Sequence, residues 1–136
     1  MPSKRLIAGL VAAAAVLVVA GGLAANQFEA SRRLDARAGA LTGGGDPERG
    51  REFILRRGCG GCHSIPRVPG ARAKVGPPLD GFAGRAYIAG REANQPENLM
   101  RWIENPHAVD PQTAMPPMGI QREEARDIAA FLYTLK

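Results

Sequence analysis

The chain has 136 residues, enough for one domain of ordinary size, and it is rich in glycine and proline but poor in aromatic residues. Such a composition leaves the domain only a small apolar core of its own. The formal net charge is +5 at pH 7, but three of these charges belong to residues 1–45, where the charged residues are Lys4, Arg5, Glu29, Arg32, Arg33, Asp35 and Arg37. The remaining charge of +2 is too small to indicate binding to nucleic acid.

The first predicted element is a membrane-spanning helix in residues 1–25. After Lys4 and Arg5, an uncharged and mostly apolar run extends from Leu6 to Ala25. Twenty helical residues at about 1.5 Å each span roughly 30 Å, which matches the hydrocarbon core of a bilayer. The two basic residues are expected to stay in the cytoplasm. We therefore expect a single-pass protein of the cytoplasmic (inner) membrane of a bacterium, with the rest of the chain in the periplasm.

The fate of this segment has two interpretations. Gly22-Leu23-Ala24 has the small-x-small pattern at which signal peptides are cleaved. The apolar run, however, is longer than the usual signal core of about 7–15 residues. This favours a retained anchor over a cleaved leader, and both deliver the following domain outside the cytoplasm.

Residues 26–45 are predicted to be a linker. The part up to Leu41 is rich in alanine and arginine and can continue the membrane helix. The run Gly43-Gly44-Gly45 is expected to end that helix and to act as a hinge. The sequence therefore indicates a tether between the membrane segment and a domain at residues 46–136.

The domain is expected to begin with a helix. Asp46 is suited to be its N-cap and Pro47 its first residue, while Gly58 is suited to end it. Gly50 and Ile54 lie on one narrow apolar face. Because glycine has no side chain, a second helix can pack closely at this face.

Cys59-Gly60-Gly61-Cys62-His63 follows this helix and predicts covalent attachment of a c-type haem. Two thiols separated by two residues can each bond one vinyl group of a porphyrin, and the adjacent His63 then supplies an axial iron ligand. The alternatives are a thioredoxin-like redox pair, half of a zinc site, or a structural disulfide. A thioredoxin-like pair needs a βαβ pattern, and a zinc site needs two more soft ligands in a chain with only two cysteines and two histidines.

The remainder alternates irregular segments with helices. Residues 64–78 and 80–95 lack helical periodicity, a helix is expected from Pro96 to about Asn105, and residues 106–119 are again irregular. The strongest helical pattern covers about Arg122 to Leu135, with acidic residues at its start and apolar residues on one face. No stretch alternates as a strand does, so the predicted fold class is all-α.

Residues 46–136 resemble the class I cytochrome c family. Besides the cysteine motif, the segment Val75-Gly76-Pro77-Pro78-Leu79-Asp80-Gly81-Phe82-Ala83-Gly84-Arg85 is similar to the family's Gly-Pro-x-Leu-x-Gly-x-x-Gly-Arg segment. The resemblance implies three to four helices around one haem. It also implies that the carbonyl of Pro77 accepts a hydrogen bond from the haem histidine, that Arg85 lies near a haem propionate, and that Tyr87 donates to a propionate.

A second segment, residues 99–106, is similar to the family's helix ending in Asn-Pro. In the family the sixth iron ligand is a methionine nine residues after that proline, and the residue at this spacing is Met115. The resemblance also implies that Thr113 bonds a propionate and that Trp102 packs on the haem in place of a tyrosine. Met118 and His107 are the alternative ligands.

Histidine and methionine together fill both axial positions and leave none for a substrate, so the resemblance implies a carrier of single electrons and not an enzyme. One haem c, bound through Cys59 and Cys62, is the expected cofactor. The expected partners are a quinol-oxidising complex (bc1-type) and a terminal oxidase. A basic surface at the haem edge would steer docking, with Arg56, Arg57, Arg67, Arg72 and Lys74 as its candidates.

Two other functions stay open at this point. One is a fixed monohaem subunit of a larger membrane redox complex, with the transmembrane helix as a packing element. The other is a haem sensor or peroxidase-like enzyme that binds small ligands by losing Met115.

Overall fold

The computed structural model describes residues 3–136, so Met1 and Pro2 of the predicted membrane segment lie outside the described residues. The chain forms two compact units, which meet between Leu34 and Asp35. Helix α1 (Lys4–Leu41) includes this boundary. Within the described residues, α1 is the one helix that is long and apolar enough, over Ile7–Leu41, to cross a membrane. A secretion signal near the N-terminus meets the same criteria of length and composition, so this finding fits both interpretations of the segment.

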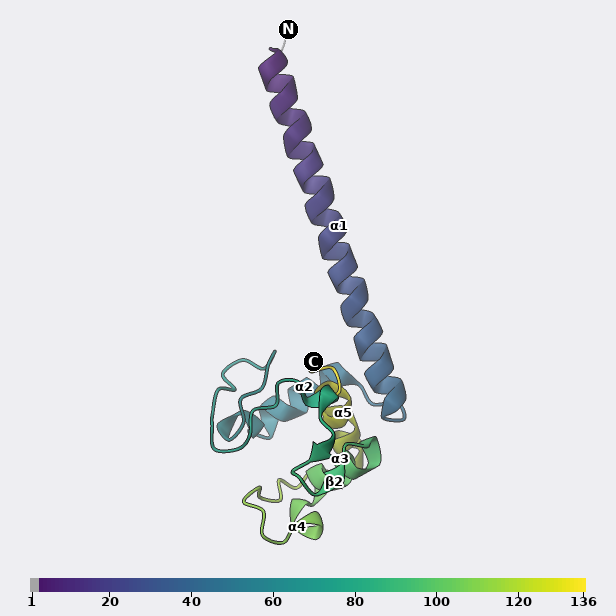
Figure 1. Ribbon diagram of the computed structural model, residues 1–136, viewed down its shortest axis with the longest axis vertical. Coiled ribbons are helices and arrows are strands. Elements are labelled where there is room, and N and C mark those ends of the chain that lie inside the picture. Colours follow the sequence, from purple (N-terminus) through teal and green to yellow (C-terminus); the bar gives the residue numbers. More distant parts are fainter. Residues whose placement is uncertain (1–2) are drawn as a thin grey trace. The chain divides into compact units, whose positions relative to one another are not determined.

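Helices are the main regular elements of the second unit, and irregular segments connect them (Figure 1). Its elements after α1 are α2 (Pro47–Arg56), the short 3-10 helices η1 (Cys59–Gly61) and η2 (Phe82–Gly84), strands β1 (Tyr87–Ile88) and β2 (Glu92–Ala93), and helices α3 (Pro96–Glu104), α4 (Pro106–Val109) and α5 (Arg122–Leu132). The all-α prediction is confirmed. Three details differ: residues 106–109, expected to be irregular, form the short helix α4, the last helix ends at Leu132 and not near Leu135, and β1 and β2 form a two-residue antiparallel pair. Positive φ angles at Ala89 and Gly90 reverse the chain there and bring the two strands together.

The close contact of α2 with α5 is the centre of the fold. As the sequence predicted, Asp46 caps α2 by accepting hydrogen bonds from the backbone N–H groups of Glu48 and Arg49. Gly50 then lies directly against α5, because a Cβ built on it would stand 2.0 Å from the backbone oxygen of Asp127. Only a glycine allows this approach. It brings Ile54 into a core with Leu99 of α3 and Phe131 of α5, each at most 1% exposed.

The loops complete this core. Ile65 and Val68 come from the segment after the cysteine motif, Phe82 comes from η2, and Ile88 from β1, and all four side chains are buried. The ring of Phe82 meets the ring of Tyr133 edge-on at a centroid distance of 6.0 Å. Irregular segments with few apolar residues are therefore held in place by single buried side chains.

The glycine run at residues 43–45 ends α1, as the sequence predicted. Gly43 and Gly44 have φ angles of 71° and 98°. The N–H of Gly43 donates to the carbonyl of Ala40 (3.2 Å), and the N–H of Gly44 donates to that of Gly39 (2.8 Å). These two bonds are the Schellman cap that ends many helices. The run therefore forms an ordered turn, because its glycines supply the left-handed backbone that the cap needs.

We predict that Gly50→Ala weakens the fold. The new methyl group has to push α2 away from the Asp127 backbone, and overpacking of this kind costs about 1–3 kcal/mol. Urea denaturation of the full-length, haem-loaded protein in detergent measures the free energy of unfolding. Gly84→Ala is the control, because a Cβ there meets nothing within 4 Å. Equal stability of the two variants would contradict the prediction.

Candidate functional site

The cysteine motif begins where α2 ends. Gly58 takes a left-handed conformation with φ 73°, which stops the helix, and Cys59 then opens η1. The N–H groups of Cys62 and His63 both donate to the carbonyl of Cys59, at 3.2 and 3.0 Å. This tight turn holds the two thiols and the imidazole in one short, fixed segment.

The two cysteines are free thiols and partly buried. Burial raises the pKa of the Cys59 thiol. Among the described residues, no group of three or more His, Cys, Asp or Glu side chains is placed to hold a metal ion.

The imidazole of His63 is fixed from two directions. Its Nδ1 lies 2.7 Å from the carbonyl oxygen of Pro77. A carbonyl can only accept, so Nδ1 carries the proton and donates it, which leaves the Nε2 lone pair available to a metal. Gly76 lies against the ring, because a Cβ built there would stand 2.5 Å from Cε1 and 2.8 Å from Nδ1.

Backbone hydrogen bonds hold this second loop against the cysteine motif. The N–H of Gly76 donates to the carbonyl of Cys62, and the N–H of Leu79 donates to that of Ser64, both at 2.8 Å. The structure thus brings together three sequence-predicted residues, Cys62, His63 and Pro77. Two thiols and a histidine oriented with Nε2 free are the donor set that a covalently attached haem requires, so these residues fit that group.

Arg85 and Tyr87 lie farther along the same loop. The Nη2 group of Arg85 donates to the carbonyls of Pro78 and Asp80, and its guanidinium lies over the ring of Phe82 at 5.4 Å. Tyr87 in β1 is 63% exposed. The structure therefore shows Arg85 ordering the turn after Pro77, and it shows Tyr87 at the surface.

Asn94 is a structural residue of this region that the sequence did not indicate. Its side-chain amide donates to the carbonyls of Phe82 and Arg85, both at 3.0 Å, and its Oδ1 accepts a hydrogen bond from the hydroxyl of Tyr133 at 2.9 Å. Burial raises the pKa of Tyr133 to about 12, so this hydroxyl remains a donor. An isolated asparagine in an irregular segment carries no sequence pattern that could have revealed this role.

The methionine loop follows α4. The hydroxyl of Thr113 accepts from the N–H of Met115 at 3.2 Å, and Nε2 of His107 lies 3.2 Å from the carbonyl oxygen of Thr113. Met115 and Met118 are both half-buried, but of the two only Met118 packs against the described hydrophobic core. Trp102 packs against that core as well. Figure 1 shows this loop and the loop after α2 on the same side of α3 and α5 in that view.

An ion pair ties the start of the cysteine motif to α5. The guanidinium of Arg57, directly after α2, donates to both oxygens of Glu124 at 2.7 and 2.6 Å. This bond lowers the pKa of Glu124.

The five basic residues singled out in the sequence differ in their surroundings. Arg57 is neutralised by Glu124, and Arg67 donates to the hydroxyl of Thr134 at 2.8 Å. The other three, Arg56, Arg72 and Lys74, are exposed.

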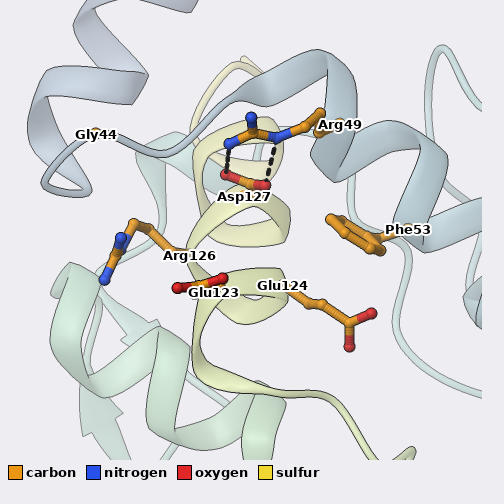
Figure 2. Close-up of a pocket in the computed structure, with 7 residues that line it drawn as sticks. All are labelled: Gly44, Arg49, Phe53, Glu123, Glu124, Arg126 and Asp127. Carbon is orange, nitrogen blue, oxygen red and sulfur yellow. Dashed lines mark hydrogen bonds and ion pairs between the residues drawn. The ribbon is translucent and has the colours of Figure 1, made fainter.

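A polar hollow of about 380 Å³ lies elsewhere, along α2 and α5 (Figure 2). Its lining residues are Gly44, Arg49, Phe53, Glu123, Glu124, Arg126 and Asp127. Arg49 and Asp127 form a bidentate ion pair at 2.9 and 3.2 Å inside it. None of the sequence-predicted site residues lines this hollow, so it is separate from the cysteine motif.

Comparison with known proteins identifies the second unit. The family model described as "Cytochrome c" matches residues 47–136. The chain is 34% identical to cytochrome c2 of Rhodoblastus acidophilus over 105 residues, which cover 68% of this chain and 94% of the relative. It is 35% identical to cytochrome c of Euglena viridis over 105 residues, covering 68% of this chain and 99% of the relative.

The chain also resembles part of a larger protein. It is 33% identical over 88 residues to cytochrome c oxidase subunit 2 of Alkalihalophilus pseudofirmus, which covers 64% of this chain and 25% of the relative. The chain thus spans about a quarter of the length of that subunit. No solved structure matches the chain significantly.

We predict that Gly76→Ala disturbs the imidazole of His63 without removing either of its nitrogen atoms. The added methyl group overlaps the His63 ring, so the imidazole has to tilt and its bond to Pro77 lengthens. Because this bond sets the basicity of the ring toward iron, the midpoint potential should shift. Redox titration of the full-length variant measures the potential, and Gly84→Ala again serves as the control. A potential equal to that of the wild type would contradict the role assigned to Gly76.

The Arg57–Glu124 pair predicts an acid-sensitive contribution to stability. Because the folded pKa of Glu124 is lowered, the stabilisation is complete above the pKa of the unfolded chain and is lost as the pH falls through the folded pKa. Glu124→Gln should cost on the order of 1 kcal/mol or less at pH 7, and the difference from wild type should vanish in acid. Urea denaturation from pH 7 to pH 3 measures it. Glu123→Gln is the control, because Glu123 is an exposed carboxylate on the same turn. A pH-independent difference would contradict the assignment.

Proposed function

The chain belongs to the cytochrome c family, and from this premise we propose that it is a monohaem electron carrier whose iron is bound by His63 and Met115 and whose N-terminal helix is retained as a membrane anchor. Members of this family are electron carriers with covalently bound haem c. The proposal adds the ligand set, the anchor, the orientation and the partners.

The observation that carries the proposal is the fixed imidazole of His63. The carbonyl of Pro77 holds the proton on Nδ1, and Gly76 limits how far the ring can rotate. Cys59 and Cys62, in the same short segment as this imidazole, would attach the haem covalently. When bound, the haem supplies reversible exchange of one electron. A ligand that the chain itself keeps in one tautomer and orientation suits this chemistry, because little has to move when the iron changes its charge.

Met115 is the proposed second ligand. Two observations support it over Met118: the loop backbone at Met115 is held by the hydroxyl of Thr113, and Met118 packs against the core. His107 is occupied with the carbonyl of Thr113 and is a weaker candidate. With a thioether and an imidazole on the iron, no position remains for a substrate, so the proposed role is transfer of electrons and not catalysis.

The proposed location is the cytoplasmic membrane of a bacterium, with the haem domain in the periplasm. The apolar residues Ile7–Ala25 of α1 are exposed and thus belong in a lipid environment. Lys4 and Arg5 on one side of this stretch support a cytoplasmic N-terminus. We propose a quinol-oxidising complex as the electron donor and a terminal oxidase as the acceptor.

A second candidate is a fixed subunit of a membrane redox complex. It is favoured by the similarity of the domain to part of a cytochrome c oxidase subunit 2. The two candidates differ in the size of the particle released by mild detergent. A carrier elutes alone, whereas a subunit elutes with its complex.

Replacing each methionine in turn tests the function. Met115→Leu should abolish the long-wavelength absorption of the methionine–iron bond, lower the midpoint potential and allow carbon monoxide to bind the reduced protein, because one axial position becomes free. Met118→Leu should keep the spectrum and lose stability only, since Met118 packs in the core. A spectrum unchanged by Met115→Leu would overturn the ligand assignment.

The exposed basic residues near the cysteine motif predict salt-dependent exchange with an acidic partner. The rate should fall by roughly tenfold or more between low and high ionic strength. Lys74→Gln should weaken this dependence, whereas Arg126→Gln, which removes the same charge from α5, should leave it nearly unchanged. Stopped-flow reduction by the detergent-solubilised quinol-oxidising complex measures the rate. Equal salt dependence for the two variants would contradict docking at this surface.

A further inference from the structure

The segment between the apolar stretch and α2 is part of the haem domain's own fold. Residues 35–45 belong to the same compact unit as the rest of the domain. Ala38 and Thr42 on the last turns of α1 are each 3% exposed, and the hydroxyl of Thr42 donates to the carbonyl of Ala38 at 2.9 Å. A free tether would expose these residues, so the segment is docked on the domain.

Gly45 is the point of closest contact. A Cβ built on it would stand 2.6 Å from the backbone oxygen of Arg126, 2.9 Å from the Cβ of Ala130 and 2.5 Å from the hydroxyl of Thr42. The backbone after the Schellman cap therefore lies directly on α5. Any side chain at this position would have to lift the turn away from that helix.

Polar contacts also hold the start of α2 on α5. The N–H of Asp46 donates to Oδ1 of Asp127 at 2.8 Å, and the guanidinium of Arg49 donates to both oxygens of the same carboxylate. Asp127 is 5% exposed, and each of its oxygens has a partner. One buried carboxylate of α5 thus holds both the end of the glycine turn and the first turn of α2.

We propose that residues 35–45 form a fixed joint that confines the haem domain to the membrane surface. This inference rests on the retained anchor proposed above. Because residues 35–45 are docked, only residues 26–34 connect the apolar stretch to the domain. Nine residues reach at most about 30 Å even when fully extended. The glycines at residues 43–45 do not lengthen this connection, because they lie within the docked segment.

Hydrogen exchange of the full-length, haem-loaded protein in lipid nanodiscs tests the docking. The amides of Gly44 and Asp46 should exchange as slowly as those of α5, because both are hydrogen-bonded in the joint. Gly45→Val should speed their exchange by about tenfold or more, since it separates the turn from α5. Ala40→Val is the matched control, because Ala40 is exposed on the last turn of α1, and it should change little. Fast exchange in the wild type, or equal effects of the two variants, would overturn the joint.

Confinement is tested with an insertion. Twenty Gly/Ser residues placed between Leu34 and Asp35 lengthen the connection and leave the joint intact. In vesicles with a headgroup-labelled phospholipid, haem quenches the label in proportion to its proximity. The wild type should quench strongly and the insertion variant several-fold less. Equal quenching would show that the domain already moves freely and would overturn the confinement.

Two readouts separate this inference from the proposed function. Intact mass of the membrane-extracted protein reports both the haem adduct and residues 1–25. A leader lost from otherwise normal haem protein would overturn the confinement while leaving the electron carrier in place. Protected amides in a protein whose spectrum is unaffected by Met115→Leu would support the joint and contradict the ligand assignment.

Discussion

The backbone contact between α2 and α5 at Gly50 is the constraint on which the rest of the domain depends. It places the start of α2 beside Asp127 and its end beside Glu124. Through the first contact the membrane-proximal turn is fixed to α5, and through the second the cysteine motif is fixed to it. Helix α5 thus holds both ends of α2 in place. A domain with so few aromatic residues has a small apolar core, and the close crossing of the two helices adds to the packing of that core.

Backbone contacts also position the residues of the candidate site. The loop from Ser64 to Asp80 has no regular structure, yet backbone bonds from Gly76 and Leu79 return it to the cysteine motif. These bonds bring the carbonyl of Pro77 to the imidazole of His63. Proline suits this position because its fixed φ restricts the backbone that carries the carbonyl, so less conformational freedom is lost when the carbonyl accepts the hydrogen bond from His63. The orientation of the His63 imidazole therefore follows from the path of the main chain and needs no further side chain.

The sequence predicts the parts of this fold that depend on local pattern. The capped helix after Asp46, the start of the last helix at Arg122, the glycine contact and the all-α class all follow from spacing and turn residues, whereas the end of the last helix was placed near Leu135 and lies at Leu132. Long-range hydrogen bonds do not follow from such patterns. Asn94 and Asp127 were missed for this reason: each acts through partners that are close only after folding. The strand pair was missed because two residues are too few to show alternation.

The conformation of the glycine run at residues 43–45 also depends on contacts that a local sequence pattern does not reveal. Three consecutive glycines are compatible with a flexible hinge and with a Schellman cap, because both need residues that accept positive φ. What selects the cap is the surface on which the turn lies. The Asp127 carboxylate accepts the N–H of Asp46, and the small side chain of Ala130 leaves space for the Gly45 backbone, and neither neighbour is adjacent in sequence. Flexibility is thus a property of the turn and its neighbours together, so composition alone cannot assign it.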